Sequence, residues 1–279
     1  MTKLKKLLQD KMNEDKIEIA PSSFEVIGNR EKAVAIVEIP EEMEKEKVFV
    51  AAAIMEMHSN VKTVLKKLSE RKTEFRTRDF EIIAGDKNTE VMHKEYGYWL
   101  KVDSQKVYFS AREAVERQRI AQQVKSNEIV MIFFAGIGAY AIAIAKKQDV
   151  EKIYAIEINP DAVGYMKENA RINRIAHKIV PILGDVKKSA KEFYGKCDRV
   201  VMPLPLGASE FLEDAVLCLK KKGIVHFYIL VDKNDFESAN KKIERVCKKL
   251  KKRFRILNQQ KVSEYSPRKW KVCIDFEIL

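Results

Sequence analysis

An uncharged and mostly apolar run covers residues 129–145, and it constrains the fold of this chain more than any other feature. The run is slightly short for a membrane span, and Gly136 and Gly138 interrupt it. A buried strand, a tight glycine turn and the start of a helix explain it better than a transmembrane segment does. We therefore expect no membrane span here, and a strand–turn–helix unit within an α/β domain.

Strands and helices continue to alternate after this unit. Hydrophobic periodicity predicts strands at KIYAIEI, KIVPIL, DRVVMPL, IVHFYIL and KVCIDFEIL. It predicts helices at DAVGYMKENARIN and SEFLEDAVLCLKKK, and a basic amphipathic helix over 241–255 with Phe254 in its apolar stripe. This rhythm is typical of a mostly parallel sheet with helices on both faces, a Rossmann-like α/β architecture. We expect it to occupy residues 110–279, beginning with a connecting helix.

The N-terminal part of the chain has a different pattern. Residues 1 to about 20 predict one polar helix, and a second helix is predicted after Lys47. Short strands are predicted at 24–29, 33–40, 80–85 and 96–103. We therefore expect a smaller α+β domain over residues 1–109.

The charge of the chain favours a polyanionic partner. Its 279 residues include 53 Lys and Arg against 41 Asp and Glu, a formal net charge of +12. Lysine and arginine displace counterions from nucleic-acid phosphates, although a lysine-rich soluble surface has the same composition. The 4 cysteines form no CxxC pair, so we expect no metal site and no disulfide framework. The N-terminus has no apolar segment typical of a signal peptide, and we expect a cytoplasmic protein.

The glycine turn has the pattern of a nucleoside-binding loop. Gly136 and Gly138 lie directly between a strand and a helix, where glycine lets a ligand approach the backbone. Glu157 ends the next strand, about 20 residues on, where a carboxylate can bind ribose hydroxyls. The third glycine of a dinucleotide fingerprint is missing, so S-adenosylmethionine fits better. The alternative is a turn that serves packing alone.

Two further positions frame this predicted pocket. Asp185 follows another strand, where an acid can meet the adenine amino group or can instead cap a helix. Asn159 and Pro160 follow Glu157, and either shape the rim of the pocket or form an ordinary turn.

Long segments of the chain resemble one enzyme family. These segments include FRTRDFEIIAGDKNTEVMHKEYGYWLKVD, VYFSAREAVERQRIA, FAGIGAYAIAIAKK, IYAIEINPDAVGYMKENARIN, DRVVMPLPLGASEFLEDAVLCLKKKGIVHFY and YSPRKWKVCIDFEI. They are similar to the archaeal and eukaryotic tRNA (guanine-N1)-methyltransferases that act at tRNA position 37. The family also includes wyosine-pathway enzymes, which transfer a methyl or an aminocarboxypropyl group to a tricyclic derivative of the same guanosine. The likeness runs from about Ser22 to the C-terminus.

The resemblance implies a fold, a cofactor and a substrate. It implies a class I methyltransferase domain with a seven-stranded sheet, S-adenosylmethionine as the cofactor, and an N-terminal domain that binds RNA or acts as a linker. It implies tRNA as the partner, bound at the anticodon stem-loop by a monomer. Some archaeal members carry an additional N-terminal domain that contacts the tRNA elbow, which we do not expect in this chain.

The resemblance also assigns chemical roles. Methylating guanine N1 requires loss of its proton to a base and stabilisation of charge on O6. The family's glutamate and arginine for these tasks match Glu116 and Arg76. A solvated salt bridge of Glu116 with Arg112 or Arg119 at helical spacing is the alternative for that residue. For Arg76, which has Arg78 nearby, the alternative is phosphate binding.

The remaining candidates follow from the same resemblance. We predict that the cofactor is bound by Tyr108, Phe134, Ala135, Gly136, Gly138, Glu157, Ile158, Asn159, Asp185, Val186 and Pro203. We predict that RNA is bound by Arg76, Arg78, Arg112, Arg117, Arg268 and Lys269. The target base must leave the anticodon-loop stack to reach the pocket.

The chain departs from the family pattern at several positions. Ile132 stands where many relatives have aspartate, Ala111 replaces a proline, and Ala139 and Tyr140 follow a loop that is commonly G-x-G-P-F. Pro203 stands where related enzymes have an asparagine that orients the base, and proline offers no side-chain polar atom. Three functions therefore stay open: guanine-N1 methylation, a wyosine-pathway transfer, and a catalytically weak tRNA-binding paralogue.

Overall fold

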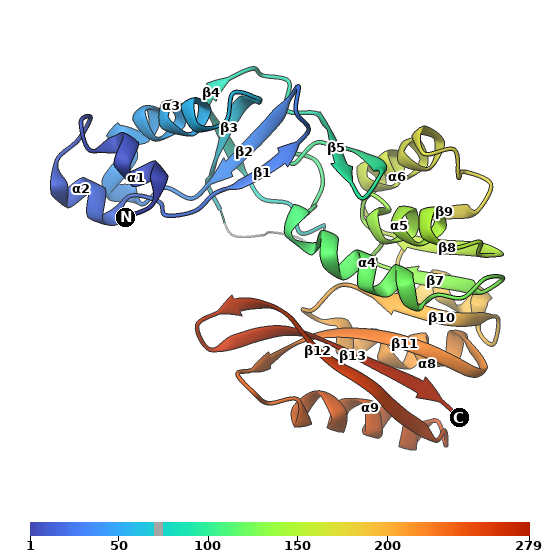
Figure 1. Cartoon of the computed structure of the whole chain (residues 1–279). Coiled ribbons are helices and arrows are strands. Elements are labelled where there is room, and N and C mark those ends of the chain that lie inside the picture. The colour runs from blue at the N-terminus through green and yellow to red at the C-terminus, as the bar shows by residue number, and fades with distance from the viewer. Residues whose placement is uncertain (70–74) are drawn as a thin grey trace. The chain divides into compact units, whose positions relative to one another are not determined.

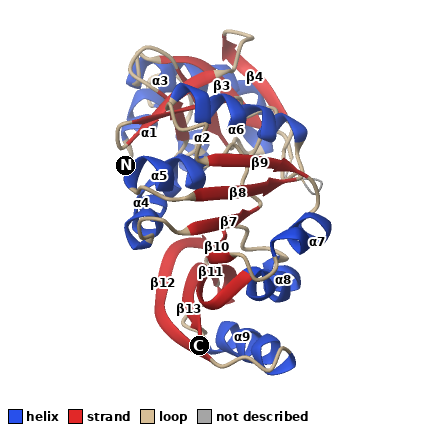
Figure 2. Ribbon diagram, turned by 90° about the vertical axis from the view of Figure 1, so that its right-hand side faces the viewer, coloured by secondary structure: helices blue, strands red, loops and turns tan. Residues whose placement is uncertain are grey.

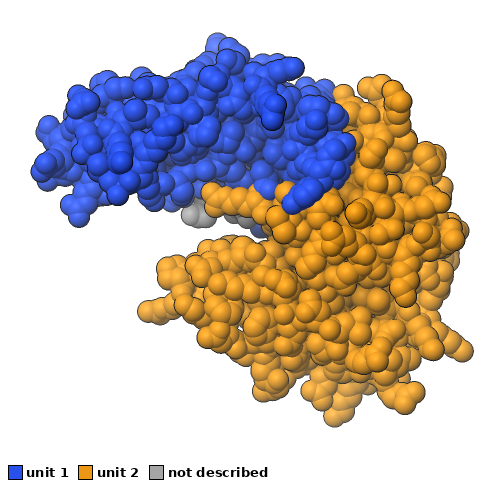
Figure 3. All heavy atoms as spheres, in the orientation of Figure 1, with its two compact units in different colours: residues 1–111 blue, residues 112–279 orange. Residues whose placement is uncertain are grey.

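The computed structural model describes residues 1–69 and 75–279 (Figure 1). The chain divides into two compact units, which Figure 3 distinguishes by colour. Unit 1 comprises residues 1–111 and unit 2 comprises residues 112–279.

Unit 1 is an α+β unit built on a four-stranded sheet in the order β1-β2-β3-β4. The β1–β2 and β3–β4 pairs are antiparallel, whereas β2 and β3 are parallel. Its strands are β1 (Glu25–Gly28), β2 (Ala33–Val37), β3 (Val61–Lys67), β4 (Phe80–Gly85), β5 (Val91–Glu95) and β6 (Tyr98–Val102). The last two form a separate antiparallel hairpin. The parallel β2–β3 crossover runs through the 3-10 helix η1 (Glu41–Glu46) and the helix α3 (Lys47–Met57).

The N-terminal helix predicted for residues 1–20 is wrong as a single element. The structure has two short helices, α1 (Lys3–Leu8) and α2 (Glu14–Ile19), with a turn between them. Leu4 and Leu8 of α1 are buried in a core that also contains Ile54 of α3. Leu4 and Leu8 are one helical turn apart, so a short helix is enough to bury both. The polar residues after Leu8 do not continue the helix.

Unit 2 is built on a seven-stranded sheet in the order β12-β13-β11-β10-β7-β8-β9. The strands are β7 (Ile129–Phe133), β8 (Lys152–Glu157), β9 (Ile179–Leu183), β10 (Cys197–Met202), β11 (Leu219–Asp232), β12 (Phe254–Ser266) and β13 (Lys269–Ile278). Neighbours from β11 through β10 and β7 to β9 are parallel, and β13 is antiparallel to both β11 and β12. The predicted mostly parallel, seven-stranded sheet is confirmed.

Helices cover both faces of this sheet (Figure 2). The helices of unit 2 are α4 (Ala114–Gln123), α5 (Ala139–Lys147), α6 (Pro160–Ile172), α7 (Val186–Ser189), α8 (Leu212–Cys218) and α9 (Glu237–Lys249), with the 3-10 helices η2 (Ala111–Glu113, whose first residue ends unit 1), η3 (Ala190–Phe193) and η4 (Ala208–Phe211). Figure 2 shows α4 and α5 on one face and α7, α8 and α9 on the other. The helix that follows the glycine turn, α5, therefore lies on the same face of the sheet as α4.

Two predicted helix ends in unit 2 are wrong. The segment from Leu219 to Lys222 was predicted as helix, but it begins strand β11, where Leu219 pairs with Cys197 of β10. The helix predicted over 241–255 ends at Lys249, and Phe254 pairs with Ile278 as the first residue of β12. In both cases pairing within the sheet outweighs a local preference for helix.

No helix in the described residues is both long enough and apolar enough to cross a membrane. The uncharged run over 129–145 is divided between β7, the glycine turn and α5.

Candidate functional site

The glycine turn joins β7 to α5 through left-handed backbone. Phe134, Gly136 and Gly138 have φ values of 54°, 56° and 81°. The Gly138 N–H donates to the Ala135 carbonyl at 3.0 Å, which closes the turn. The helix that follows is rich in alanine and isoleucine and ends in Lys146 and Lys147. Its alanines have a high intrinsic helix propensity, and the two lysines interact favourably with the negative end of the helix dipole.

Glu157 is held against this turn at the end of β8. Its Oε2 accepts from the Gly136 N–H at 2.7 Å, and its Oε1 accepts from the N–H groups of Ile158 and Asn159 at 3.0 and 2.9 Å. Burial raises the pKa of this carboxyl, and the backbone donors act in the opposite direction. Since a carboxylate oxygen has two lone pairs, Oε2 retains room for one further donor. The arrangement suits a ribose hydroxyl.

Asp185 lies beside Glu157 because the Gly184 N–H donates to the Glu157 carbonyl at 2.9 Å. Its Oδ1 caps α7 by accepting from the Lys187 N–H at 2.9 Å. The capping alternative is therefore realised, yet Oδ2 can still accept from an amino group. Val186 is buried behind it, and Asn159 caps α6 through its Oδ1.

Glu116 is buried on α4, and both of its carboxylate oxygens accept hydrogen bonds. The Arg119 guanidinium donates to both of its oxygens at 2.8 Å, and the Tyr228 hydroxyl donates to Oε1 at 2.5 Å. The Tyr140 hydroxyl donates to the Tyr228 hydroxyl at 3.2 Å. Tyr140 is in the first turn of α5, two residues after Gly138. A continuous hydrogen-bonded path therefore runs from the glycine-turn helix to Glu116.

The two tyrosines on this path are neutral donors at ordinary pH. Burial raises the pKa of both Tyr140 and Tyr228 well above the usual value for a phenol. The salt bridge with Arg119 that the sequence offered as the alternative for Glu116 exists, but it is buried rather than solvated: Glu116 is 7% exposed. Arg112, the other cation that the sequence offered as a salt-bridge partner of Glu116, has an exposed side chain.

Pro203 lies directly after β10, at the carboxyl edge of the sheet beside β7. Ile132 is fully buried in β7 between the neighbouring strands β8 and β10. Neither side chain can donate or accept a hydrogen bond, so any polar contact to a ligand from these two positions must come from the backbone.

Unit 1 contains a pocket around Arg76. It is lined by residues that include Glu25, Lys67, Arg76, Arg78 and Tyr108. The Arg76 guanidinium lies over the Tyr108 ring, 4.6 Å from its centroid, and Arg76 has a left-handed φ of 55°. Three cationic side chains and one stacked aromatic ring suit a phosphate or an electron-rich base.

Comparisons with known proteins identify the family. Residues 91–257 match the TRM5/TYW2 methyltransferase domain, and residues 4–89 match the TYW2 N-terminal domain. The chain belongs to the TRM5/TYW2 methyltransferase family. The resemblance and the fold class predicted from the sequence are thereby confirmed.

Relatives of this TRM5/TYW2 family member include two kinds of tRNA-modifying enzyme. The tRNA (guanine(37)-N(1))-methyltransferase Trm5b of Pyrococcus abyssi is 39% identical over 259 residues, which cover 92% of this chain and 75% of the relative. A Methanocaldococcus jannaschii tRNA(Phe) (4-demethylwyosine(37)-C(7)) aminocarboxypropyltransferase is 34% identical over 203 residues, covering 72% of this chain and 80% of the relative.

Solved structures show the same division. The crystal structure of Trm5b from P. abyssi aligns with a TM-score of 0.87 at 37% identity, covering 98% of this chain and 80% of that one. A complex of aTrm5 with tRNALeu aligns at 0.86 and 35% identity, covering 99% and 78%. P. horikoshii TYW2 in complex with MeSAdo aligns at 0.81 and 26% identity, covering 99% and 98%.

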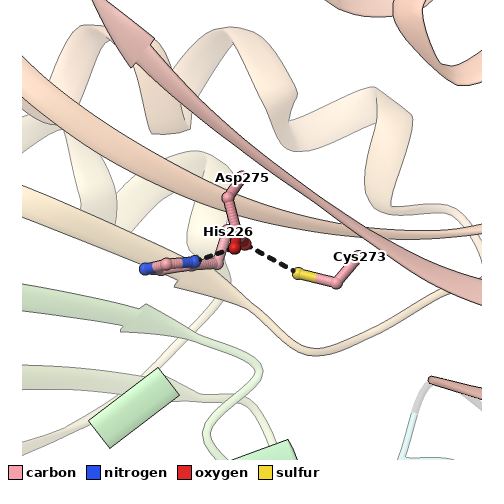
Figure 4. Close-up of side chains that lie close together, drawn as sticks. All are labelled: His226, Cys273 and Asp275. Atoms are coloured by element: carbon pink, nitrogen blue, oxygen red, sulfur yellow. Dashed lines mark hydrogen bonds and ion pairs between the residues drawn. The ribbon is translucent and has the colours of Figure 1, made fainter. Parts of the chain in front are cut away.

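The structure of this family member also forms a polar cluster that sequence reasoning missed. His226, Cys273 and Asp275 are fully buried, and their potential ligand atoms lie within 4.8 Å of one another (Figure 4). The signal was present in the sequence: residues 273 and 275 alternate along one strand and so face the same way. What the sequence lacked was the register that places His226 of β11 opposite Asp275 of β13.

This cluster is a hydrogen-bond network rather than an open set of metal ligands. His226 Nδ1 meets Asp275 Oδ1 at 2.6 Å, and His226 Nε2 meets an Arg199 nitrogen at 2.7 Å. Because the guanidinium only donates, Nε2 must accept and Nδ1 must carry the proton. Burial lowers the pKa of His226, in agreement with a neutral ring. The Nδ1 proton and its hydrogen bond to Asp275 occupy the ring atom that a metal ion at this cluster would bind.

The remaining predicted RNA-binding residues differ in exposure. Arg268 and Lys269 are exposed at the turn between β12 and β13, and Trp270 next to them lies under the Lys261 ammonium at 4.1 Å. Arg117 is 2% exposed, which is unfavourable for a surface phosphate contact. Arg117 is therefore not proposed as a phosphate contact.

Alanine substitutions at Gly138 in the glycine turn and at Gly164 in α6 are expected to change the stability of the protein in opposite directions. Gly138→Ala is expected to destabilise the protein by about 1–3 kcal/mol, because φ is 81° there and a Cβ meets Met166 Cγ at 2.6 Å. Gly164→Ala is expected to stabilise it by about 0.5–1 kcal/mol, because Gly164 is an exposed α6 residue with no atom near its Cβ position. Urea unfolding of both variants measures the pair, and equal shifts contradict the assigned backbone.

Proposed function

We propose that this chain transfers a methyl group from S-adenosylmethionine to N1 of guanosine at position 37 of tRNA. One observation carries the proposal: a buried carboxylate, Glu116, is tied by hydrogen bonds to the helix that begins at the glycine turn. Its support from relatives is the 39% identity with an enzyme named for this reaction.

The cofactor part of the site fits a nucleoside ligand. Glu157 Oε2 has one acceptor position left for ribose, and Asp185 Oδ2 is available for an amino group. Left-handed backbone at Phe134 and Gly136 brings main-chain atoms within reach of the ligand, with Ala135 between them and Ile158, Asn159 and Val186 completing the surroundings. Bound S-adenosylmethionine supplies the methyl group. Family structures with adenosine, MeSAdo and AdoMet support this choice of ligand.

The proton of guanine N1 goes to Glu116 in this proposal. The neutral base has no free lone pair on N1 for attack, so proton removal must accompany transfer. Among the described residues, Arg119 alone donates to Glu116 Oε2, which leaves a lone pair for the incoming proton. Arg76, stacked on Tyr108 in unit 1, is proposed to stabilise the charge that develops on O6. In this proposal any polar contact from Pro203 comes from its backbone, because its side chain has no polar atom.

The tRNA contact is proposed to involve the anticodon stem-loop of one tRNA bound by one protein monomer. Candidate phosphate contacts are the half-buried Arg78 and the exposed Arg112, Arg268 and Lys269. The aTrm5–tRNALeu complex of a relative supports tRNA as the polyanion that the net charge of +12 anticipates. Affinity should fall steeply as salt rises, since each phosphate contact releases a counterion.

Nucleoside analysis tests this function directly. The purified protein is incubated with S-adenosylmethionine and an unmodified tRNA transcript that has guanosine at position 37, and the digested nucleosides are identified by mass. We expect 1-methylguanosine at that position. A transcript with adenosine at position 37 is the matched control and should stay unmodified. Absence of 1-methylguanosine from the first transcript contradicts the proposal.

A second candidate function is a wyosine-pathway transfer to 4-demethylwyosine at the same position. The observations that favour it are Pro203 in place of a base-orienting amide and the match of residues 4–89 to the TYW2 N-terminal domain. A tRNA carrying 4-demethylwyosine, used in the same assay, separates the two: a product from this substrate alone selects the second candidate. Cofactor binding without either product selects the catalytically weak paralogue.

A further inference from the structure

Arg119 joins two carboxylates that come from different ends of unit 2. Its Nε and Nη2 donate to Glu116, and its Nη1 donates to Asp275 Oδ2 at 2.6 Å. A second, longer contact of 3.4 Å runs from Nη2 to Asp275 Oδ1. A salt bridge between residues three apart on a helix usually fixes little, because both side chains are mobile. Here the guanidinium is also held by the Asp275 carboxylate, which has a side-chain exposure of 0%.

Asp275 is itself held in place by several hydrogen bonds. It accepts from His226 Nδ1 at 2.6 Å and from the Cys273 thiol at 3.2 Å, and Gln123 contributes a further contact at 3.3 Å. Burial raises its pKa, but the hydrogen bond from the neutral His226 ring and the hydrogen bond and positive charge of Arg119 outweigh burial and hold that pKa well below its usual range. Asp275 is therefore a fixed negative charge.

The same hydrogen-bond network extends from His226 to Arg199 and Glu128. His226 Nε2 accepts from Arg199, and Arg199 donates to both oxygens of Glu128 at 2.7 and 2.9 Å. Arg199 is 1% exposed, and the Glu128 side chain that it contacts is 13% exposed. The Figure 4 cluster is thus the middle of a chain of contacts whose other end is Glu116.

We propose that Arg119, oriented by Asp275, is the positioning residue that fixes the Glu116 carboxylate and sets how strongly it holds a proton. The inference rests on the proposed function, because it takes Glu116 as the base. Arg119 alone beside Glu116 would stabilise the carboxylate and make it a poor base. Asp275 compensates part of that positive charge and holds the guanidinium in place.

The groups around Glu116 fix the sign of the expected changes. The ionisable groups that interact with it from the elements packed around it are Arg119 on α4, Tyr140 on α5, Tyr228 on β11 and Cys273 on β13. The tyrosines and the cysteine are neutral because burial raises their pKa values. Nearby Lys271 and Glu113 pair with each other at 2.6 Å. Arg117, the next residue on α4, is also buried and stays unchanged in the variants below, so Arg119 and Asp275 are the charges near Glu116 that the substitutions change.

Two substitutions should move the titration of Glu116 in opposite directions. Asp275→Asn removes a negative charge, so the midpoint of the Glu116 signal should move to lower pH. Arg119→Gln removes the positive charge, so the midpoint of the Glu116 signal should move to higher pH. The measurement is a carbon-13 carboxyl NMR titration of the intact protein, with the Glu116 signal assigned by its loss in Glu116→Gln. Glu277→Gln, on the same strand as Asp275 but paired with Arg255, is the matched control and should shift nothing.

The same variants should change the pH dependence of methyl transfer. The acid limb of the single-turnover rate should move down in Asp275→Asn and up in Arg119→Gln, whereas a purely structural role lowers the rate without moving either limb. Unmoved NMR midpoints in both variants, or shifts of the same sign, overturn the inference even if the wild-type enzyme makes 1-methylguanosine. Opposite shifts in a protein that makes no 1-methylguanosine leave the positioning role standing and refute the proposed function.

Discussion

Glu116→Gln is expected to lower the rate of 1-methylguanosine formation by about 10²–10⁴-fold, the usual contribution of a positioned general base. The amide keeps the size of the carboxylate and can still accept one donor from Arg119 or Tyr228, so the fold should persist. It cannot take the N1 proton. Single-turnover kinetics on a guanosine-37 transcript measures the loss, and calorimetric titration with S-adenosylmethionine should give unchanged cofactor affinity.

Glu113→Gln is the control for this variant. Glu113 lies one helical turn before Glu116 and is also a partly buried carboxylate, but it pairs with Lys271 and lies outside the proposed proton path. Its substitution should leave the transfer rate within a few-fold of wild type. If Glu116→Gln keeps the wild-type rate, the base is another group and the proton path proposed here is wrong. If both variants lose activity equally, the effect is structural.

The cofactor side of the site was readable from sequence because its determinants are local. Gly136 and Gly138 follow one strand of a β/α repeat and Glu157 ends the next, and parallel strands bring their carboxyl ends to one edge. The Glu157–Gly136 hydrogen bond is the contact that this logic anticipates. The double nature of Asp185 was also visible, since one residue can cap a helix with one oxygen and offer the other to a ligand.

The polar network behind Glu116 was not readable in the same way. Arg119 and Asp275 are 156 positions apart, and their contact depends on β13 returning antiparallel beside β11. The end of the basic helix before Phe254 escaped prediction for the same reason, because strand pairing with β13 is a long-range interaction. Local propensity favours helix through Leu219 and the lysines after it, and only pairing with Cys197 reveals the strand.

Arg199→Met is expected to cost about 3–5 kcal/mol of folding free energy, the largest stability effect of any substitution considered for this chain. Arg199 is almost completely buried, and it satisfies Glu128, His226 and the Gln123 carbonyl at once. Methionine fills much of the volume but leaves the Glu128 carboxylate without its partner, and a buried charge without a partner is strongly destabilising. Urea unfolding followed by far-UV circular dichroism measures the change.

Removing both ends of the pair separates lost charge pairing from lost packing. Arg199→Met combined with Glu128→Met should be less destabilised than the sum of the two single variants, because no unpartnered charge remains. Additive losses contradict the pairing. Arg199→Lys is a second comparison and should recover only part of the stability, since a lysine cannot reproduce the two-pronged contact.

The pH dependence of the Arg199→Met deficit supplies an independent check through His226. In the wild type burial lowers the folded-state pKa of His226, so the unfolded chain binds a proton that the folded one does not, and stability falls as pH drops below about 6.5. Without Arg199 the Nε2 atom can take a proton, and Asp275 favours the charged ring. The variant should therefore lose less stability than the wild type on acidification, and the gap between them should narrow from pH 8 to pH 5. A gap that stays constant or widens over that range would mean that His226 is not held neutral by Arg199.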